Sequence, residues 1–257
     1  MKKSVLNRHI LVILVLISAV TASVSGQDSE DYLEIRKVTG KINFDGFCDE
    51  PPWDDLATIP MTMFKPNHGS QPTERSDIFV TFDDEFLYIG ARLSYQNGST
   101  IRATTKKRDG AEGGSDNFGI LLDTFNDNEN ALCFETNPSG LRSDFTIGND
   151  AQVPLGMMSW NRSWDTFWEV KPNIIDNVLH VEFRIPLTSL RFQVTDGNVI
   201  MGMSIWRQIS SKQEWNNFPN ISNEFGNFGV WKPSQAHKII LKVMTFIKYL
   251  TAIIILI

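Results

Sequence analysis

The sequence is rich in flat aromatic side chains, which are well suited to stack against a ligand. Of its 257 residues, seven are Trp and seventeen are Phe, but only four are Tyr. Trp160 and Trp164 lie in or beside a Met-rich loop, where their rings serve either as a binding platform or as packing for the loop. Trp215 is the strongest single candidate for stacking on a ligand. Three further Trp residues are expected in the core or on a sheet face: Trp53, Trp168 and Trp206.

Charged side chains around a glycine-rich loop form a second group of candidates. Arg108 and Asp109 precede the loop 110–115, and they either contact a ligand or form an ion pair that fixes the loop. Asp116 follows the loop at the start of an expected strand, where its carboxylate either meets a ligand or caps the turn. The residues alone leave both alternatives open.

Two smaller groups could bind a metal or form a disulfide. Asp123 and Asp127 cluster oxygen ligands of the kind that Ca²⁺ takes, but the stretch lacks the DxDxDG spacing, and acidic turns are common. No other cofactor is expected. Cys48 and Cys133 are an even pair in a chain that carries an export signal, so a disulfide is allowed, and two buried thiols are the alternative.

Composition and motifs exclude several classes of function. Two Cys and four scattered His rule out a Cys₄ zinc module, an HExxH site and a zinc-finger pair. A net charge of −6 and a pI near 5.3 argue against a nucleic-acid partner, because phosphate neutralisation needs an excess of Lys and Arg. No P-loop, GxSxG elbow or strand-linked GxGxxG is present.

The first 26 residues are organised like a secretory signal peptide. Basic residues at positions 2, 3 and 8 precede an apolar stretch, Ile10 to Val20, and small residues follow at 21–26. The apolar stretch is too short to span a membrane, so we expect cleavage near residue 26, with an uncleaved anchor as the alternative.

The last segment, 236–257, is predicted to be an apolar tail outside the domain. Residues 239–257 approach the ~20 residues that a membrane-spanning helix needs. Lys242 and Lys248 lie within them, and each costs roughly 2.5–3.5 kcal/mol at a bilayer centre. We therefore prefer the interpretation that the tail is the truncated start of a further region, or a segment that is not native to the domain.

The intervening residues, 27–235, are predicted to form one all-β domain, an antiparallel β-sandwich or jelly roll. From Leu179 to Ile185, apolar and polar residues alternate, which is typical of a half-buried strand. Residues 83–85 have the length of a hairpin turn. A short helical turn is expected at 53–57. Strands are expected at 78–82, 87–93, 117–123, 131–136, 141–147, 166–170, 179–185 and 199–209.

Five segments in order resemble the family 9 carbohydrate-binding modules: 42–53, 84–90, 116–123, 134–137 and 181–186. A narrower branch, found at the front of large bacterial outer-membrane proteins with a barrel-like region, is similar at 108–109, 122–127, 137–140, 164–169 and 190–192. The resemblance covers roughly residues 38–232. It implies a β-sandwich that binds carbohydrate, in an exported protein of the periplasm, outer membrane or cell exterior.

The resemblance also implies a site in which two Trp rings clamp a sugar and polar side chains bind its hydroxyls. Asn137 matches a polar position of the family, and Trp215 lies near the second clamp position. The loop 110–115 has no aromatic residue for the first clamp. Gly119 replaces a Glu of the central strand, and Glu135 replaces an Arg of the next strand. The sugar site is thus expected to carry over only in part.

Three functions follow as alternatives. The first is an exported, non-catalytic domain that binds a poly- or oligosaccharide in glycan capture or carbohydrate catabolism. The second is a structural periplasmic or surface domain of an outer-membrane protein with a degenerate sugar site. The third is a glycoside hydrolase, but the sequence marks no carboxylate pair at the spacing that hydrolysis requires.

Overall fold

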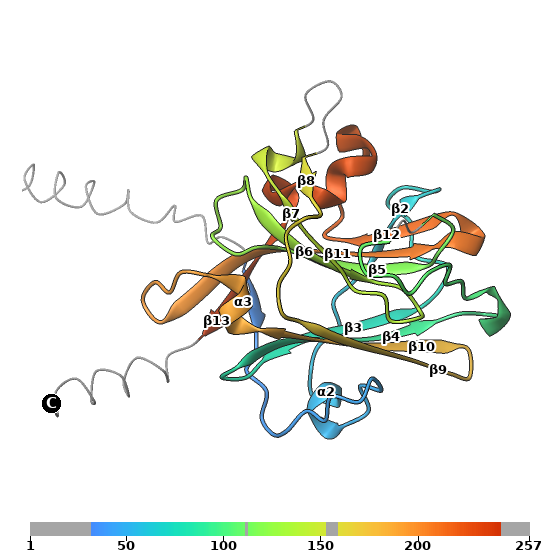
Figure 1. The fold of residues 1–257 in the computed structure, drawn as a ribbon, viewed down its shortest axis with the longest axis horizontal. Helices are drawn as coiled ribbons and strands as arrows, with labels where there is room; N and C mark the ends of the chain where they lie inside the picture. Colours follow the sequence, from blue (N-terminus) through green and yellow to red (C-terminus); the bar gives the residue numbers. More distant parts are fainter. Residues whose placement is uncertain (1–31, 111–112, 153–158, 243–257) are drawn as a thin grey trace, which may run out of the picture. The chain divides into compact units, whose positions relative to one another are not determined.

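The structure is a computed structural model that describes residues 32–110, 113–152 and 159–242 (Figure 1). The expected signal peptide at 1–26 and residues 243–257 of the expected tail lie outside these ranges. Among the described residues, no helix has the length and apolar character needed to cross a membrane.

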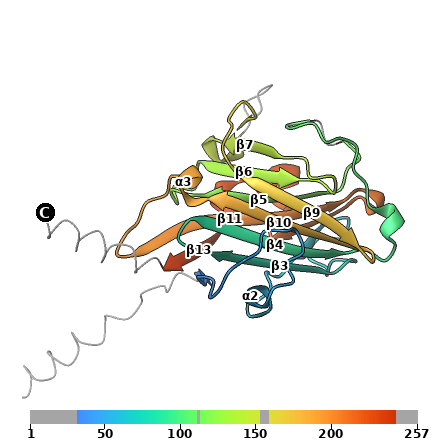
Figure 2. The same cartoon turned by 60° about the horizontal axis from the view of Figure 1, so that its bottom comes forward.

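Two β-sheets stacked face to face make up the domain (Figures 1 and 2), which confirms the predicted all-β sandwich. The four-stranded sheet has the order β3 (Ser76–Phe82), β4 (Phe86–Ser94), β10 (Val178–Pro186), β9 (Glu169–Ile175). The nine-stranded sheet has the order β1 (Leu33–Ile35), β13 (His237–Lys242), β11 (Asn198–Ile209), β5 (Asn117–Asp123), β6 (Ala131–Thr136), β7 (Ser143–Ile147), β8 (Trp160–Asn161). In the same sheet, β12 (Glu214–Phe218) pairs with β11 and with β2 (Thr62–Lys65).

The main core lies between the sheets and follows the alternation of the strands. Every second residue of β4 and β10 points inward, as do Phe118, Ile120 and Leu122 of β5. Phe118 and Phe183 join the two sheets, with ring centroids 5.7 Å apart. Trp168 packs against Phe183 and is fully buried, which confirms its predicted core position.

The outer face of the four-stranded sheet is closed by a loop and by α2 (Pro51–Asp54), which lie below that sheet in Figure 1. The helical turn begins two residues earlier than expected, because Pro suits the first position of a helix. Trp53 is 0% exposed and belongs to a separate hydrophobic cluster with Cys48, Phe79 and Tyr88. It is therefore a core plug, as predicted.

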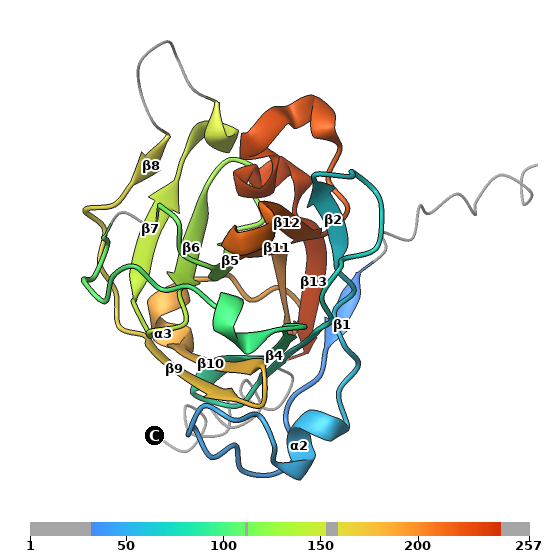
Figure 3. The same cartoon turned by 90° about the vertical axis from the view of Figure 1, so that its right-hand side faces the viewer.

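Three short 3₁₀ helices lie against the outer face of the nine-stranded sheet: η2 (Asn149–Ala151), η4 (Asn223–Trp231) and η5 (Pro233–Gln235). They appear above β11 and β12 in Figure 3. Beneath them is a second outer cluster that includes Leu121, Cys133, Phe145 and Trp206. The sandwich thus has three hydrophobic layers, one inside and one on each outer face.

The domain extends beyond its expected boundary at residue 235. β13 is an interior strand of the nine-stranded sheet, antiparallel to β11 and parallel to β1. Ile239 and Leu241 are buried in the main core. Residues 236–242 therefore belong to the domain and not to a tail, because their alternate side chains complete the core.

The disulfide that the sequence allowed is not formed. Cys48 and Cys133 are free, fully buried thiols in separate hydrophobic clusters on opposite outer faces of the sandwich. Burial raises the pKa of both thiols, and the charges of Glu182 and Glu135 raise the pKa of Cys48 and Cys133 further. The structure has the alternative, two buried thiols.

Candidate functional site

Four Trp side chains meet on the outer face of the nine-stranded sheet. Trp231, at the end of η4, is central: its ring centroid lies 5.3 Å from that of Trp160, 6.1 Å from Trp206 and 6.0 Å from Trp215. Phe228 of the same 3₁₀ helix lies 5.6 Å from Trp160. We call these five residues the aromatic patch. Sequence analysis predicted Trp160 and Trp215 as binding residues but gave no role to Trp231 or Phe228.

Trp206 forms the floor of the patch and is only 4% exposed, as predicted for a sheet-face residue. Its ring lies directly against Gly119 of β5, where a Cβ atom would approach it to 2.2 Å. Its indole N–H donates a hydrogen bond of 3.1 Å to Glu135. The two departures from the family pattern, Gly119 and Glu135, are thus explained together, since Gly119 makes room for the Trp206 ring and Glu135 accepts the hydrogen bond of its indole N–H.

The upper part of the patch is open to solvent. Trp160, Trp215 and Trp231 are each partly exposed, and Phe228 is 39% exposed. The ammonium group of Lys65 lies 5.2 Å from the centre of the Trp215 ring. The rings are mostly perpendicular or tilted, so the patch offers several faces and edges and not one plane.

Polar atoms lie beneath the patch without hydrogen-bond partners among the described residues. Asn217 pairs with Trp206 across β11 and β12, is 1% exposed, and has neither its amide N–H nor its carbonyl hydrogen-bonded. The hydroxyl of Ser204 and the indole N–H of Trp231 are also buried without a hydrogen-bond partner among the described residues. Buried polar groups normally have partners, so these atoms mark places where a buried water molecule can bind beneath the rings.

Trp164 lies apart from the patch although it is only four residues from Trp160. Its ring packs edge-on against Phe134, with centroids 6.2 Å apart, and it borders a cavity of about 470 Å³. Phe125, which is 50% exposed, lines the same cavity. Trp160 belongs to β8, which pairs with β7, whereas Trp164 lies beyond the end of that strand.

Arg108 and Asp109 are engaged in a network of charges. The Arg108 guanidinium lies 2.5 Å from Asp144, 2.6 Å from Asp165 and 3.5 Å from Asp109. Burial raises the pKa of Asp144, while the hydrogen bond from the Thr166 N–H and the charge of Arg108 act in the opposite direction. The geometry favours the ion pair over ligand contact, because the guanidinium is already surrounded by carboxylates.

Asp116 and Asn137 hold backbone segments together at the start of β5 and the end of β6. The Asp116 carboxylate accepts hydrogen bonds from the N–H groups of Arg102, at 3.1 Å, and Ser210, at 2.7 Å. Asn137 donates to the Thr105 carbonyl at 2.8 Å and accepts from the Ser139 N–H at 3.0 Å. Both side chains are 1% exposed, so they shape loops beside the patch and do not reach its surface.

Asp123 and Asp127 are brought together in a turn. The two Asp123 oxygens accept the N–H groups of Asp127 and Asn128, and Asp127 accepts those of Glu129 and Asn130. The ammonium group of Lys238 lies 3.8 Å from Asp123. These contacts favour turn capping over a calcium site, because the carboxylate oxygens already accept hydrogen bonds and the Lys238 ammonium group lies next to Asp123.

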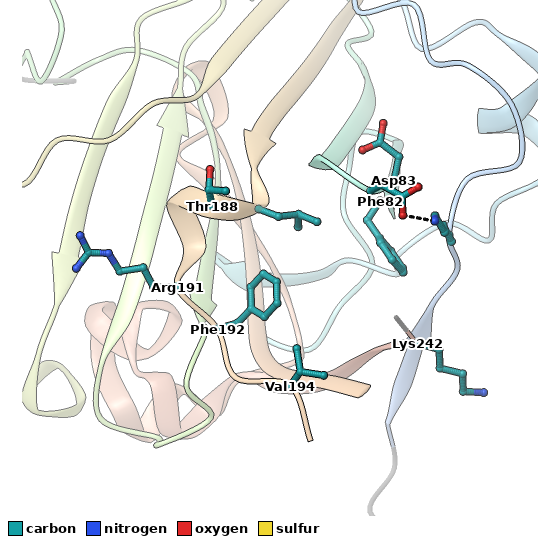
Figure 4. A pocket seen from close by; sticks show the side chains of 10 residues that line it. Phe82, Asp83, Thr188, Arg191, Phe192, Val194 and Lys242 are labelled. Carbon is teal, nitrogen blue, oxygen red and sulfur yellow. Dashed lines mark hydrogen bonds and ion pairs between the residues drawn. The ribbon is translucent and has the colours of Figure 1, made fainter. Parts of the chain in front are cut away.

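An apolar pocket that the sequence did not predict opens at the end of the sandwich near the ends of β1, β3 and β13 (Figure 4). It has a volume of about 310 Å³, and Phe82 and Phe192 face it from opposite walls. Lys37 forms an ion pair with Asp84 at its rim. Nothing in the pocket distinguishes one ligand class from another.

No family model matches the sequence, and no curated protein matches it. The fold is similar to that of a family 9 carbohydrate-binding module from Caldicellulosiruptor kristjanssonii, solved in complex with cellotriose and with glucose. The TM-score is 0.54 at 19% identity in both, covering 82% of this chain and 94% or 96% of the other. A candidate carbohydrate-binding protein from Bacteroides uniformis ATCC 8492 is similar with a TM-score of 0.60 at 10% identity, covering 83% of this chain and 100% of the other. These likenesses confirm the fold that the sequence resemblance predicted.

Proposed function

We propose that this domain binds carbohydrate without catalysis and that the aromatic patch is its binding surface. The observation that carries the proposal is the partial exposure of three neighbouring rings, in which Trp231 contacts both Trp160 and Trp215. The C–H faces of a sugar stack on aromatic rings, so exposed Trp faces and edges suit this class of ligand.

The structural neighbours support the ligand class. The Caldicellulosiruptor module was solved with cellotriose and with glucose, so gluco-oligosaccharides are the first ligands to test. The arrangement of rings in this chain differs from a two-Trp clamp, because the loop 110–115 contributes no aromatic residue. We therefore expect the ligand to contact the patch from one side.

The proposed setting is outside the bacterial inner membrane, in glycan capture or carbohydrate catabolism. It is supported by the basic and apolar segments within residues 1–26 and by the resemblance to domains at the front of outer-membrane proteins. Expression of the full chain with fractionation and N-terminal sequencing tests it. Mature protein beginning near residue 27 in the periplasm or medium is expected, and uncleaved cytoplasmic protein would contradict export.

Binding is tested by isothermal titration against xylo- and gluco-oligosaccharides, with Trp fluorescence as a second readout. Trp215→Ala is the diagnostic variant, and Trp164→Ala is its matched control because that ring borders a cavity apart from the patch. We expect Trp215→Ala to weaken binding about ten-fold, equivalent to about 1.4 kcal/mol, and Trp164→Ala to leave it unchanged. Equal losses in both variants would assign the sugar to another surface.

One observation favours the second candidate, a structural domain with a degenerate sugar site. Trp206 fills the space above Gly119 and hydrogen-bonds to Glu135, the two positions where the resemblance places sugar-binding Glu and Arg residues. If this candidate is correct, the folded domain gives flat titrations with every oligosaccharide in the panel. Saturable binding at micromolar affinity would eliminate it.

A further inference from the structure

The cavity that Trp164 borders opens where β5 and β7 end and β6 begins. We call it the Trp164 cavity. None of its described lining residues belongs to the aromatic patch. Its volume of about 470 Å³ lies within the range of about 300–1,000 Å³ that is usual for small-molecule sites. The cavity is therefore large enough for a small ligand and separate from the proposed sugar-binding surface.

Two aromatic side chains give the cavity an apolar surface. Trp164 is partly exposed, and its edge-on contact with Phe134 holds the ring against the main core. Phe125, just beyond the end of β5, is 50% exposed. Leu132 and the buried Leu190 also line the cavity. Rings of this kind offer a surface on which the C–H face of a ligand packs.

Hydrogen-bonding groups of both kinds line the same cavity. The Asn161 carbonyl oxygen accepts the N–H of Ser163 at 3.0 Å, while its amide nitrogen has no hydrogen-bond acceptor among the described residues. The hydroxyls of Ser159 and Ser189 donate to backbone carbonyls, so their oxygens remain able to accept. A ligand with several hydroxyl groups finds donors and acceptors here.

Arg191 supplies a positive charge to the cavity. It directly follows α3 (Leu187–Leu190), is exposed, and is the only charged side chain among the described lining residues. It forms no ion pair within 4.0 Å in the described part of the chain. Figure 4 shows its side chain pointing away from Phe192 and out of the apolar pocket. A guanidinium is a planar fork of N–H donors that matches a carboxylate, so this one is available to an anionic group.

The cavity brings together segments that the sequence singled out and that the aromatic patch does not use. Phe125, Trp164 and Arg191 come from residues 122–127, 164–169 and 190–192, three of the five segments that resemble the narrower branch. The fold places these distant segments around one space. Two rings and a cation therefore converge on the Trp164 cavity.

We infer that the Trp164 cavity is a second binding site and that its ligand is a small saccharide unit carrying a carboxylate. The sugar ring packs against Trp164 and Phe125, its carboxylate pairs with Arg191, and its hydroxyls bind the polar groups of the wall. A neutral sugar leaves the guanidinium without its anionic partner and so binds more weakly. The inference does not depend on sugar binding at the aromatic patch.

The test compares glucuronic acid with glucose, titrated into the full domain by calorimetry. The two sugars share one ring and differ in having a carboxylate or a hydroxymethyl group at C6. We expect glucuronic acid to bind about ten-fold more tightly, because a hydrogen bond to a charged group contributes about that factor. Added NaCl should reduce this difference, since salt screens exposed charges.

Arg191→Gln is the principal variant, because the side chain is exposed and the substitution removes only its charge and fork of donors. It should weaken the binding of glucuronic acid about ten-fold and leave that of glucose unchanged. Trp164→Ala should also weaken glucuronic acid binding. Trp215→Ala is the matched control at the aromatic patch and should retain it, so failure of one site is distinguishable from failure of the other.

Three results would overturn the inference. The first is glucuronic acid binding no more tightly than glucose. The second is Arg191→Gln keeping the affinity of the parent for glucuronic acid, or Trp215→Ala losing it while Trp164→Ala does not. The third is inorganic phosphate binding as tightly as glucuronic acid, which would make the cavity a general anion site and not a saccharide site.

Discussion

The two outer faces of the sandwich share one packing arrangement, but different segments of the chain cover them. On each face, a Gly in an interior strand pairs with a buried Glu of the next strand, and a Trp ring lies against the Gly. The residues are Gly90, Glu182 and Trp53 on the four-stranded sheet, and Gly119, Glu135 and Trp206 on the nine-stranded sheet.

The covers distinguish the two faces. On the four-stranded sheet, a loop and α2 enclose Trp53 completely. On the nine-stranded sheet, Trp206 is buried under rings that are themselves partly exposed, and polar atoms around Asn217 have no partner. A Trp ring packed on a Gly therefore indicates close packing of a sheet face. Whether that face can bind a ligand depends on which side chains of the covering segments remain exposed to solvent.

The largest expected difference between the faces is in stability. Trp53→Ala removes a fully buried ring and should lower the free energy of unfolding by about 3–5 kcal/mol. Trp231→Ala removes a partly exposed ring and should cost about 1 kcal/mol, near the typical value for a substitution. Urea denaturation followed by circular dichroism measures both. Equal losses would show that the aromatic patch is as essential to the fold as the closed face.

Overpacking at Gly119 gives the next largest effect. Because an added Cβ would approach the Trp206 ring to 2.2 Å, Gly119→Ala should destabilise the domain by about 1–3 kcal/mol. Gly113, which has nothing within 4 Å of its Cβ position, is the control site, and Gly113→Ala should change stability by less than about 0.5 kcal/mol. In a Trp206→Leu background, Gly119→Ala should lower the free energy of unfolding less than it does in the parent protein. An equal loss in both backgrounds would show that contact with the Trp206 ring does not cause the destabilisation.

A smaller effect is expected for the ring at the edge of the patch. Trp215→Ala should lower the free energy of unfolding by less than about 1 kcal/mol, because the side chain is partly exposed and its strand is held by β11 and β2. Thermal and urea unfolding, combined with the sugar titration, separate stability from binding. A loss comparable to that of Trp53→Ala would make the patch a core element and not a binding surface.

The smallest expected difference is in the reactivity of the two thiols. Burial and raised pKa values should keep both Cys48 and Cys133 unreactive toward a disulfide reagent at pH 8 until the protein opens. The cover over Cys133 includes short 3₁₀ helices with exposed rings, so we expect it to open more often. Mass spectrometry should find Cys133 labelled first, and the reverse order would contradict the comparison of the two covers.

Alternation identified the strands that build the core, but shorter or more polar strands escaped it. β5, β6 and β10 were predicted nearly to the residue because apolar side chains alternate or run continuously there. β12 was missed because Asn216 and Asn217 are buried without being apolar. The strand expected at 166–170 begins at residue 169, and the one expected at 141–147 begins at residue 143.

The sequence predicted individual residues of the candidate site but not how they come together. Trp160 and Trp215 were selected as exposed rings, and the structure joins them through Trp231, which comes from a 3₁₀ helix whose placement depends on tertiary packing. Alternation along β11 could have shown that Trp206 shares a face with Ser204 and lies opposite Ile205. Asn137 and Asp116 looked like ligand contacts because sequence does not reveal which backbone groups a polar side chain will meet.

The parallel pairing of β1 with β13 has a mechanical consequence. Leu33 lies beside Ile239 and Ile35 beside Leu241, so the two strands run side by side in the same direction. A pulling force applied at Leu33 and Lys242 is directed along the strands and loads their hydrogen bonds in shear, all at once. The domain should therefore resist stretching between these two points more strongly than if the same strands could be peeled apart one bond at a time.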